Sequence, residues 1–267
     1  MQIWDAQFAA RSPMFAPLRA LAEATAGAQW PGPHALSRLA SARGVRCGGG
    51  HALRFAALPM SGAADYELRI QDEGVVPLRA ANWHDLFNAL VWLAFPHTKA
   101  ALNAAHAAEL RGQHGGLSTV RSARRDALTL FDESGVLVIS SSAAVLAGLR
   151  AFAWQRVFWQ EREALMGSTR FVIFGHALYE KALSPYVGMS GHALLLHTPQ
   201  ACVTLDEPAL LVQADVLAAA ALRNGILSTR DLAPLPVLGV PGWYGANKDA
   251  GFYANTDYFR PGRTRVL

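Results

Sequence analysis

Cysteine is scarce in this sequence of 267 residues, and the two that occur, Cys47 and Cys202, lie far apart with no CxxC spacing. A disulfide framework or a zinc knuckle is therefore not expected, and a reducing compartment fits. Long apolar runs are missing as well, because the stretch 135–149 is too short to span a bilayer as a helix. The N-terminus has no basic run before its apolar stretch, unlike a secretory signal. We expect a soluble, cytoplasmic protein with no membrane partner.

Charged residues are also few, at 16%, whereas hydrophobic residues make up 52% of the chain. This composition fills a sizeable core and argues against disorder. GxSxG, GxGxxG and GxxxxGK[ST] motifs are all missing, so neither a nucleophilic serine elbow nor a glycine-rich nucleotide loop is expected. The net charge of +4 allows a phosphate-bearing partner without requiring one.

Helical and strand patterns alternate irregularly along the chain. Alanine-rich segments up to residue 43, and the segments Asn82–Phe95 and His97–Gly112, have the spacing of helices. The alternation of apolar and polar residues at 66–70 predicts a half-buried strand that ends in a turn at Asp72–Gly74. Residues 124–140 are expected to form a strand, a turn at Asp132–Gly135 and a second strand.

The second half adds an aromatic-rich helix at 151–163, strands at 170–174 and 192–197, a short helix at 176–183 and a helix that ends at Gly225. Without regular βαβ alternation, the fold class predicted is α+β, with mixed helices and short strands around one core. We expect a single domain over residues 1–267, with a possible N-terminal helical and hairpin subregion at 1–80. A long irregular arm, rich in proline, glycine and aromatic residues, follows at 234–267.

A short apolar strand leads into His176 and Glu180, which are one helical turn apart. Side chains at i and i+4 share a helix face, so the pair can bind one divalent metal ion or act in proton transfer. The alternative is an ordinary pair on a solvated helix surface. A metal needs further ligands, and Asp126 is the first candidate. Asp132 and Glu133 are equally compatible with a plain hairpin turn.

The apolar helix at 82–95 contributes further polar groups. Asn82 is suited to an N-cap, with Asp85 three residues later. His84 and Asn88 share a helix face that can reach a ligand. The alternative is that these two residues form the one solvent-exposed polar stripe of the helix. The basic cluster Arg121–Arg125 can bind phosphate, or can simply be a solvated loop.

The site predicted from these patterns is a polar pocket covered by the C-terminal arm. Its catalytic residues are His176, Glu180 and Asp126, of which His176 and Glu180 hold the metal. Its binding residues are Asp85, Asn88, Arg125, Trp243, Asn247 and Arg260.

Five segments resemble a bacterial family catalogued as domain of unknown function 3025. They are NWHDLFNALVWLAFPHTKAALN, RRDALTLFDESGVLV, FVIFGHALYEKAL, PLPVLGVPGW and FYANTDYFRP, and the likeness runs from about Asn82 to Arg260. The resemblance implies a bacterial cytoplasmic setting, and it implies no activity and no catalytic residues.

Two functions follow as hypotheses. The first is a metal-assisted or acid/base hydrolase in which carboxylates and histidine hold a divalent ion or activate water, and arginines hold a small anionic substrate. The second is a non-catalytic binding or regulatory module, whose basic excess and exposed tryptophans recognise an acidic or nucleic-acid partner.

Overall fold

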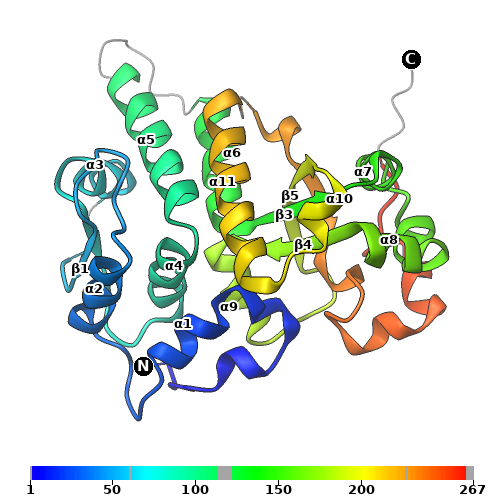
Figure 1. Ribbon diagram of the computed structural model, residues 1–267, viewed down its shortest axis with the longest axis horizontal. Helices are drawn as coiled ribbons and strands as arrows, with labels where there is room; N and C mark the ends of the chain where they lie inside the picture. The colour runs from blue at the N-terminus through cyan, green and yellow to red at the C-terminus, as the bar shows by residue number, and fades with distance from the viewer. Residues whose placement is uncertain (1, 60–61, 114–121, 226–227, 263–267) are drawn as a thin grey trace.

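The computed structural model describes residues 2–59, 62–113, 122–225 and 228–262, and its elements are shown in Figure 1. The part up to residue 113 is mostly helical. Its elements are η1 (Phe8–Ala10), η2 (Pro13–Leu18), α1 (Arg19–Ala24), α2 (Pro33–Ala42), β1 (Arg54–Ala56), α3 (Ala63–Glu73), β2 (Val75–Pro77), α4 (Trp83–Ala94) and α5 (Pro96–Gln113).

The remainder combines helices with the strands of a larger sheet. Its elements are α6 (Ala123–Ser134), β3 (Gly135–Ser140), α7 (Ala143–Arg150), the π-helical turn η3 (Arg156–Gln160), α8 (Arg162–Ser168), β4 (Thr169–Ile173), α9 (His176–Ala182), β5 (Ser190–His197), α10 (Gln200–Val203), α11 (Glu207–Gly225), η4 (Thr229–Asp231), β6 (Ala233–Pro236), η5 (Val237–Gly239), η6 (Gly245–Lys248) and η7 (Ala250–Ala254).

The four-stranded sheet has the order β4-β3-β5-β6. Strand β3 pairs with β4 antiparallel and with β5 parallel, and β5 pairs with β6 antiparallel. A separate two-stranded sheet is formed by β1 and β2, which run parallel. Small sheets of mixed direction among many helices make this an α+β fold, as the sequence predicts. Among the described residues, no helix combines the length and apolar character needed to cross a membrane.

The predicted strand at residues 66–70 is wrong, because this segment is the helix α3. The apolar residues Tyr66 and Ile70 are four apart and fit a helical period as well as an alternating one. Gly74 adopts φ +67° as the C-cap, which is the left-handed conformation that ends many helices. The helix connects two parallel strands, so the predicted hairpin of the N-terminal subregion is wrong as well.

The predicted strand and turn at residues 124–135 are also wrong, because helix α6 occupies the segment and leads directly into β3. The buried residues Ala127, Leu128 and Phe131 are spaced for one face of a helix. The Ser122 hydroxyl caps the helix by accepting from the Arg125 amide at 3.1 Å.

Other elements agree with the sequence. Asn82 caps α4 by accepting from the Asp85 amide at 2.9 Å, as its spacing predicts. The strands β4 and β5 and the helices α4, α5, α9 and α11 lie where the apolar patterns indicate them. The arm begins with a strand, β6, that the sequence did not indicate, and it continues through short 3-10 turns.

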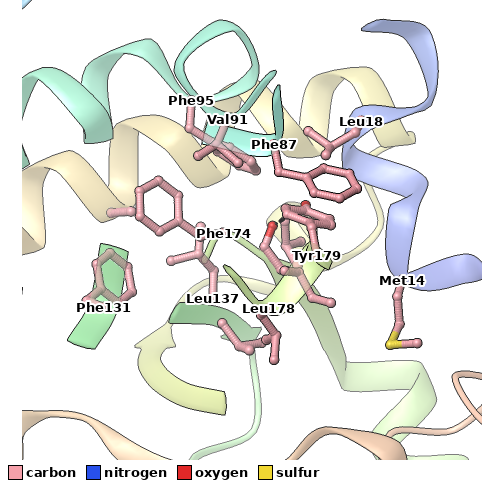
Figure 2. Packing of buried hydrophobic residues seen from close by; sticks show 14 of the residues in the cluster. Met14, Leu18, Phe87, Val91, Phe95, Phe131, Leu137, Phe174, Leu178 and Tyr179 are labelled. Atoms are coloured by element: carbon pink, nitrogen blue, oxygen red, sulfur yellow. Dashed lines mark hydrogen bonds between the residues drawn. The ribbon is translucent and has the colours of Figure 1, made fainter. Parts of the chain in front are cut away.

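One cluster of buried apolar side chains extends from Phe8 to Phe259, and its central part is shown in Figure 2. There Phe87 of α4 stacks against Tyr179 of α9 with ring centroids 5.8 Å apart, and Phe131 of α6 stacks on Phe174 at 4.8 Å. These contacts fix α4, α6 and α9 against each other. The cluster supports the expectation of a single domain, which stays a prediction.

Candidate metal centre

A backbone contact between two glycines brings the end of α6 against the start of α9. A Cβ atom on Gly175 would lie 2.4 Å from the amide nitrogen of Gly135, so a side chain does not fit there. The amides of Phe174 and Gly175 both donate to the carbonyl of Gly135, at 2.9 and 2.8 Å. The last turn of α6 therefore lies directly beside His176, the first residue of α9.

Two histidines and one glutamate from three helices converge at this point. The Nε2 atoms of His84, on α4, and His176 are 3.1 Å apart. An oxygen of Glu133, in the last turn of α6, lies 3.7 Å from His176 Nε2, and one ligand atom from each residue fits within a 4.8 Å span. Tetrahedral ligands at about 2.0–2.2 Å from Zn²⁺ lie roughly 3.3 Å from each other. The three side chains can therefore hold a divalent metal with small shifts.

The outer nitrogen of each histidine faces a carboxylate. His84 Nδ1 lies 3.1 Å from Oε2 of Glu180, and His176 Nδ1 lies 3.8 Å from Oδ2 of Asp132. Histidines that bind metals commonly direct their second nitrogen to a carboxylate, which orients the ring and raises its basicity. His84 makes this contact at hydrogen-bond distance, whereas the Asp132 carboxylate faces His176 from farther away, at 3.8 Å.

The pair of facing nitrogens is unfavourable for two neutral imidazoles. If each ring keeps its proton on Nδ1, toward Glu180 and Asp132, two lone pairs face each other across 3.1 Å. If His176 instead carries its proton on Nε2, its bare Nδ1 faces the Asp132 carboxylate, and this atom is buried with no hydrogen-bond partner among the described residues. A cation between the rings removes the conflict, because both Nε2 lone pairs then point at the cation and both protons stay on Nδ1.

The protonation states suit metal binding. Burial lowers the pKa of His176 to about 3, so the ring is neutral at neutral pH and its lone pair is available. Burial alone would raise the pKa of Asp132, but the surrounding charges together outweigh burial and the net pKa is lowered. The ammonium of Lys99, 2.6 Å away, is the foremost of these charges. Lys99 is 4% exposed and also donates to Asn88 Oδ1 at 2.9 Å. Asp132 thus stays ionised behind His176.

A cavity of about 330 Å³ opens beside the three candidate ligands. Its walls come from α3, α4, α5, α6, α9 and the segment after β2, and nearly all of its side chains are polar. They are Ala63, Tyr66, Glu67, Pro77, Arg79, His84, Asp85, Asn88, His106, Arg125, Thr129, Asp132, Glu133 and His176. We call this cavity the α4–α6 pocket. Arg121 of the basic cluster lies outside the described residues.

The structure brings some of the predicted site residues together here. His176, Asp85, Asn88 and Arg125 line the α4–α6 pocket, and Glu180 contacts it through His84. His84 and Glu133 are not among the site residues predicted from the sequence. For Glu133 the signal is visible once α6 is known to be a helix, since Thr129 and Glu133 are then one turn apart on one face.

The other predicted residues lie elsewhere. Asp126 is exposed in the first turn of α6 and does not line the pocket. Trp243 lines a different cavity, of about 370 Å³, beside β4. Asn247 is buried and donates to the carbonyls of Leu238 and Val240, so its role in the arm is structural.

Arg260 is exposed, and its Nε donates to the carbonyl of Asp257 at 2.9 Å. The arm thus packs on its own residues and on the aromatic cluster around η3. Its described part, up to residue 262, contributes no side chain to the lining of the α4–α6 pocket. Tryptophan exposure also differs from expectation. None of the seven tryptophans, all of which lie in the described ranges, is exposed.

Glu67 of α3 is an unusual carboxyl in the same pocket. Burial, followed by the nearby Asp132 charge, raises its pKa to about 7. Its oxygen accepts from Asn103 Nδ2 at 2.9 Å. A carboxyl that titrates near neutral pH inside a pocket is suited to general acid and base catalysis.

The raised pKa of Glu67 predicts a pH-dependent stability. The unfolded chain loses this proton near pH 4.5 and the folded chain near pH 7. Between these values the folded state binds more protons, so the free energy of unfolding falls as pH rises, by about 3 kcal/mol at most because pocket water reduces the effect. Glu67→Gln should remove this slope in urea unfolding at pH 5 and pH 8.

The exposed Asp65 of the same helix provides the control for this experiment. Asp65→Asn should keep the wild-type pH dependence, because that carboxyl is in solvent. Parallel stability curves for Glu67→Gln and the wild type would show that Glu67 ionises at an ordinary pH.

The fold and the cluster define an α+β protein with a candidate three-ligand metal centre. The family described as protein of unknown function (DUF3025) matches residues 53–263, which include every residue of this centre. The chain belongs to this family. No curated protein and no solved structure matches the chain.

Proposed function

We propose that the protein is a metal-dependent hydrolase whose metal is held by His84, His176 and Glu133. The observation that carries this proposal is the pair of Nε2 atoms 3.1 Å apart, each on a ring whose other nitrogen faces a carboxylate. Glu180 and Asp132 orient the two rings. This assignment gives Glu180 a supporting role, in place of the ligand role that the sequence suggests.

The number of ligands favours catalysis over a structural role. Structural zinc sites are closed by four protein ligands, whereas catalytic sites keep three and leave a position for water or substrate. A divalent metal in such a site supplies a water whose pKa is lowered to about 7, or polarises a substrate carbonyl or phosphoryl group. Hydrolysis is the reaction class that needs nothing beyond this water.

The chain supplies the remaining functions of a hydrolase. The polar pocket admits a small substrate next to the candidate ligands. Glu67 lines the same pocket and exchanges a proton near neutral pH, so it is suited to protonate a leaving group or to accept a proton from water. Lys99 keeps Asp132 charged and fixed.

Metal removal and reconstitution test the proposal. The protein is stripped with a chelator, dialysed and titrated with Zn²⁺ or Co²⁺, with metal content measured by elemental analysis. We expect one metal per chain, a higher melting temperature with bound metal, and metal-dependent hydrolysis of at least one of p-nitrophenyl acetate, p-nitrophenyl phosphate and bis-p-nitrophenyl phosphate.

Two variants make this test specific. His84→Ala should lose both metal and hydrolysis, whereas His34→Ala, which removes an exposed histidine of α2, should retain both. Metal binding without hydrolysis would support the metal centre and would reject the proposed hydrolase activity. Equal metal content in His84→Ala and the wild type would reject the centre itself.

A further inference from the structure

Arg79 is held rigidly at the wall of the α4–α6 pocket by a buried carboxylate. Its Nε donates to Asp85 Oδ2 at 2.9 Å and its Nη2 donates to Asp85 Oδ1 at 2.6 Å, which is a two-pronged contact. The backbone amide of Arg79 donates to the same Oδ2 at 2.6 Å. Asp85 is 6% exposed and is itself fixed in the first turn of α4. The plane of the guanidinium is therefore set before any ligand arrives.

Part of this guanidinium remains available. A guanidinium has five N–H groups, and Asp85 accepts two of them. The remaining three lie on Nη1 and on the outer side of Nη2, and no hydrogen bond from Nη1 to a described residue occurs. The side chain is 49% exposed although its partner is buried. The Nη1–Nη2 edge thus offers a second two-pronged contact to a planar or tetrahedral anion.

The position of Arg79 connects this edge to the candidate metal centre. Arg79 lines the same cavity of about 330 Å³ as His84, Glu133 and His176. Asp85 is the next residue after His84, so one turn of α4 supplies both a candidate metal ligand and the residue that orients Arg79. Arg125 of α6 adds a second positive charge to the wall.

We propose that Arg79 is the anion-binding residue of this pocket, and that the substrate is a small molecule carrying a carboxylate or phosphate group. The proposal rests on the metal centre described above. The anion contacts the Nη1–Nη2 edge, while the bond to be hydrolysed lies toward His84, His176 and Glu133. The cavity volume restricts the substrate to the size of a small metabolite. Fixing the guanidinium in advance favours binding, because less side-chain freedom is lost when the anion arrives.

Anion titrations with and without metal test this proposal. Inorganic phosphate and malonate are titrated by calorimetry into the Co²⁺-loaded protein and the metal-free protein, and the Co²⁺ absorption spectrum reports metal occupancy. We expect Arg79→Met to weaken binding of the preferred anion by about tenfold or more, which corresponds to loss of hydrogen bonds to a charged group. Arg79→Lys, which keeps the charge without the planar fork, should also weaken binding.

Arg156→Met is the matched control. Arg156 is 42% exposed and makes a comparable contact with both oxygens of Glu161, but it does not line the pocket. It should bind the anion as the wild type does. Stronger binding of phosphate than of malonate assigns a phosphate group to the substrate, and the reverse assigns a carboxylate.

The outcomes separate this inference from the metal centre. Equal anion affinity in wild type and Arg79→Met, or no binding of either anion to the Co²⁺-loaded protein, would overturn the role of Arg79 and leave the metal centre intact. Absence of a Co²⁺ spectrum would reject the centre, and an Arg79-dependent affinity in the metal-free protein would then support the anion site alone. Thermal unfolding of each variant shows whether it is folded.

Discussion

Replacing His176 with alanine is expected to lower the affinity of the protein for Zn²⁺ by more than a hundredfold without unfolding it. The substitution removes one of three candidate ligands and leaves His84 facing a void. Glu180→Gln should have a smaller effect, roughly tenfold to a hundredfold, because Glu180 contacts the outer nitrogen of His84 at 3.1 Å and acts through that ring. Both affinities are measured by competition with a chromophoric chelator.

The ratio of these two effects decides the role of Glu180. A loss in Glu180→Gln as large as that in His176→Ala would make Glu180 a direct ligand. A smaller loss in Glu180→Gln, together with a large loss in Glu133→Gln, supports the arrangement of His84, His176 and Glu133. Unchanged Zn²⁺ affinity in His176→Ala would rule out both arrangements. The exposed His34 again provides the control, since His34→Ala removes a histidine from a helix outside the pocket.

Lys99→Met is expected to destabilise the protein by about 3–5 kcal/mol at pH 8, the cost typical of removing one partner from a buried ion pair. Lys99 is 4% exposed, and its ammonium donates to Asp132 at 2.6 Å and to Asn88 at 2.9 Å. Without it, the Asp132 carboxylate, whose side chain is 15% exposed, loses the ammonium that contacts it. Its pKa then rises, so the loss should be smaller at pH 5, where the carboxyl takes up a proton.

A second substitution distinguishes the ion pair from simple packing. In Lys99→Met with Asp132→Leu both charges are gone, and much of the lost stability should return, since apolar replacement of a whole buried pair is often neutral. Lys181→Met, which changes an exposed lysine of α9, should alter stability by less than about 0.5 kcal/mol. The free energies come from urea unfolding. A single-mutant cost below about 1 kcal/mol, equal at both pH values, would contradict this role of Lys99.

The sequence predicts those parts of the fold whose local pattern has one solution. Asn82 is followed by an acidic residue at the capping-box position and by a long apolar run, and α4 forms there. The short run Phe171–Phe174 is apolar and is followed by Gly175, and β4 forms over Thr169–Ile173. Segments α3 and α6 were misassigned because, over five or six residues, apolar positions can match both a two-residue and a helical period.

The site is harder to predict, because its parts are adjacent only after folding. His84 and His176 are 92 residues apart, and their contact depends on the packing of Phe87 against Tyr179 one turn further along each helix. A strand at residues 124–131 makes Glu133 a turn residue, whereas the helix α6 places it on the face that lines the pocket. The arm illustrates the converse: its aromatic and amide side chains resemble binding groups, but Asn247 bonds the backbone of the arm itself.

Because of the contact between Gly135 and Gly175, two of the candidate ligands are positioned together and the third is positioned separately. Glu133 and His176 are carried by two segments that share one hydrogen-bonded junction at the rim of the sheet, so their mutual position is settled when β3 and β4 pair. His84 arrives separately, on a helix from the first third of the chain. A cation bound by all three residues would therefore link α4, from the first third of the chain, to the segments around β3 and β4. Only a completely folded molecule would retain this cation.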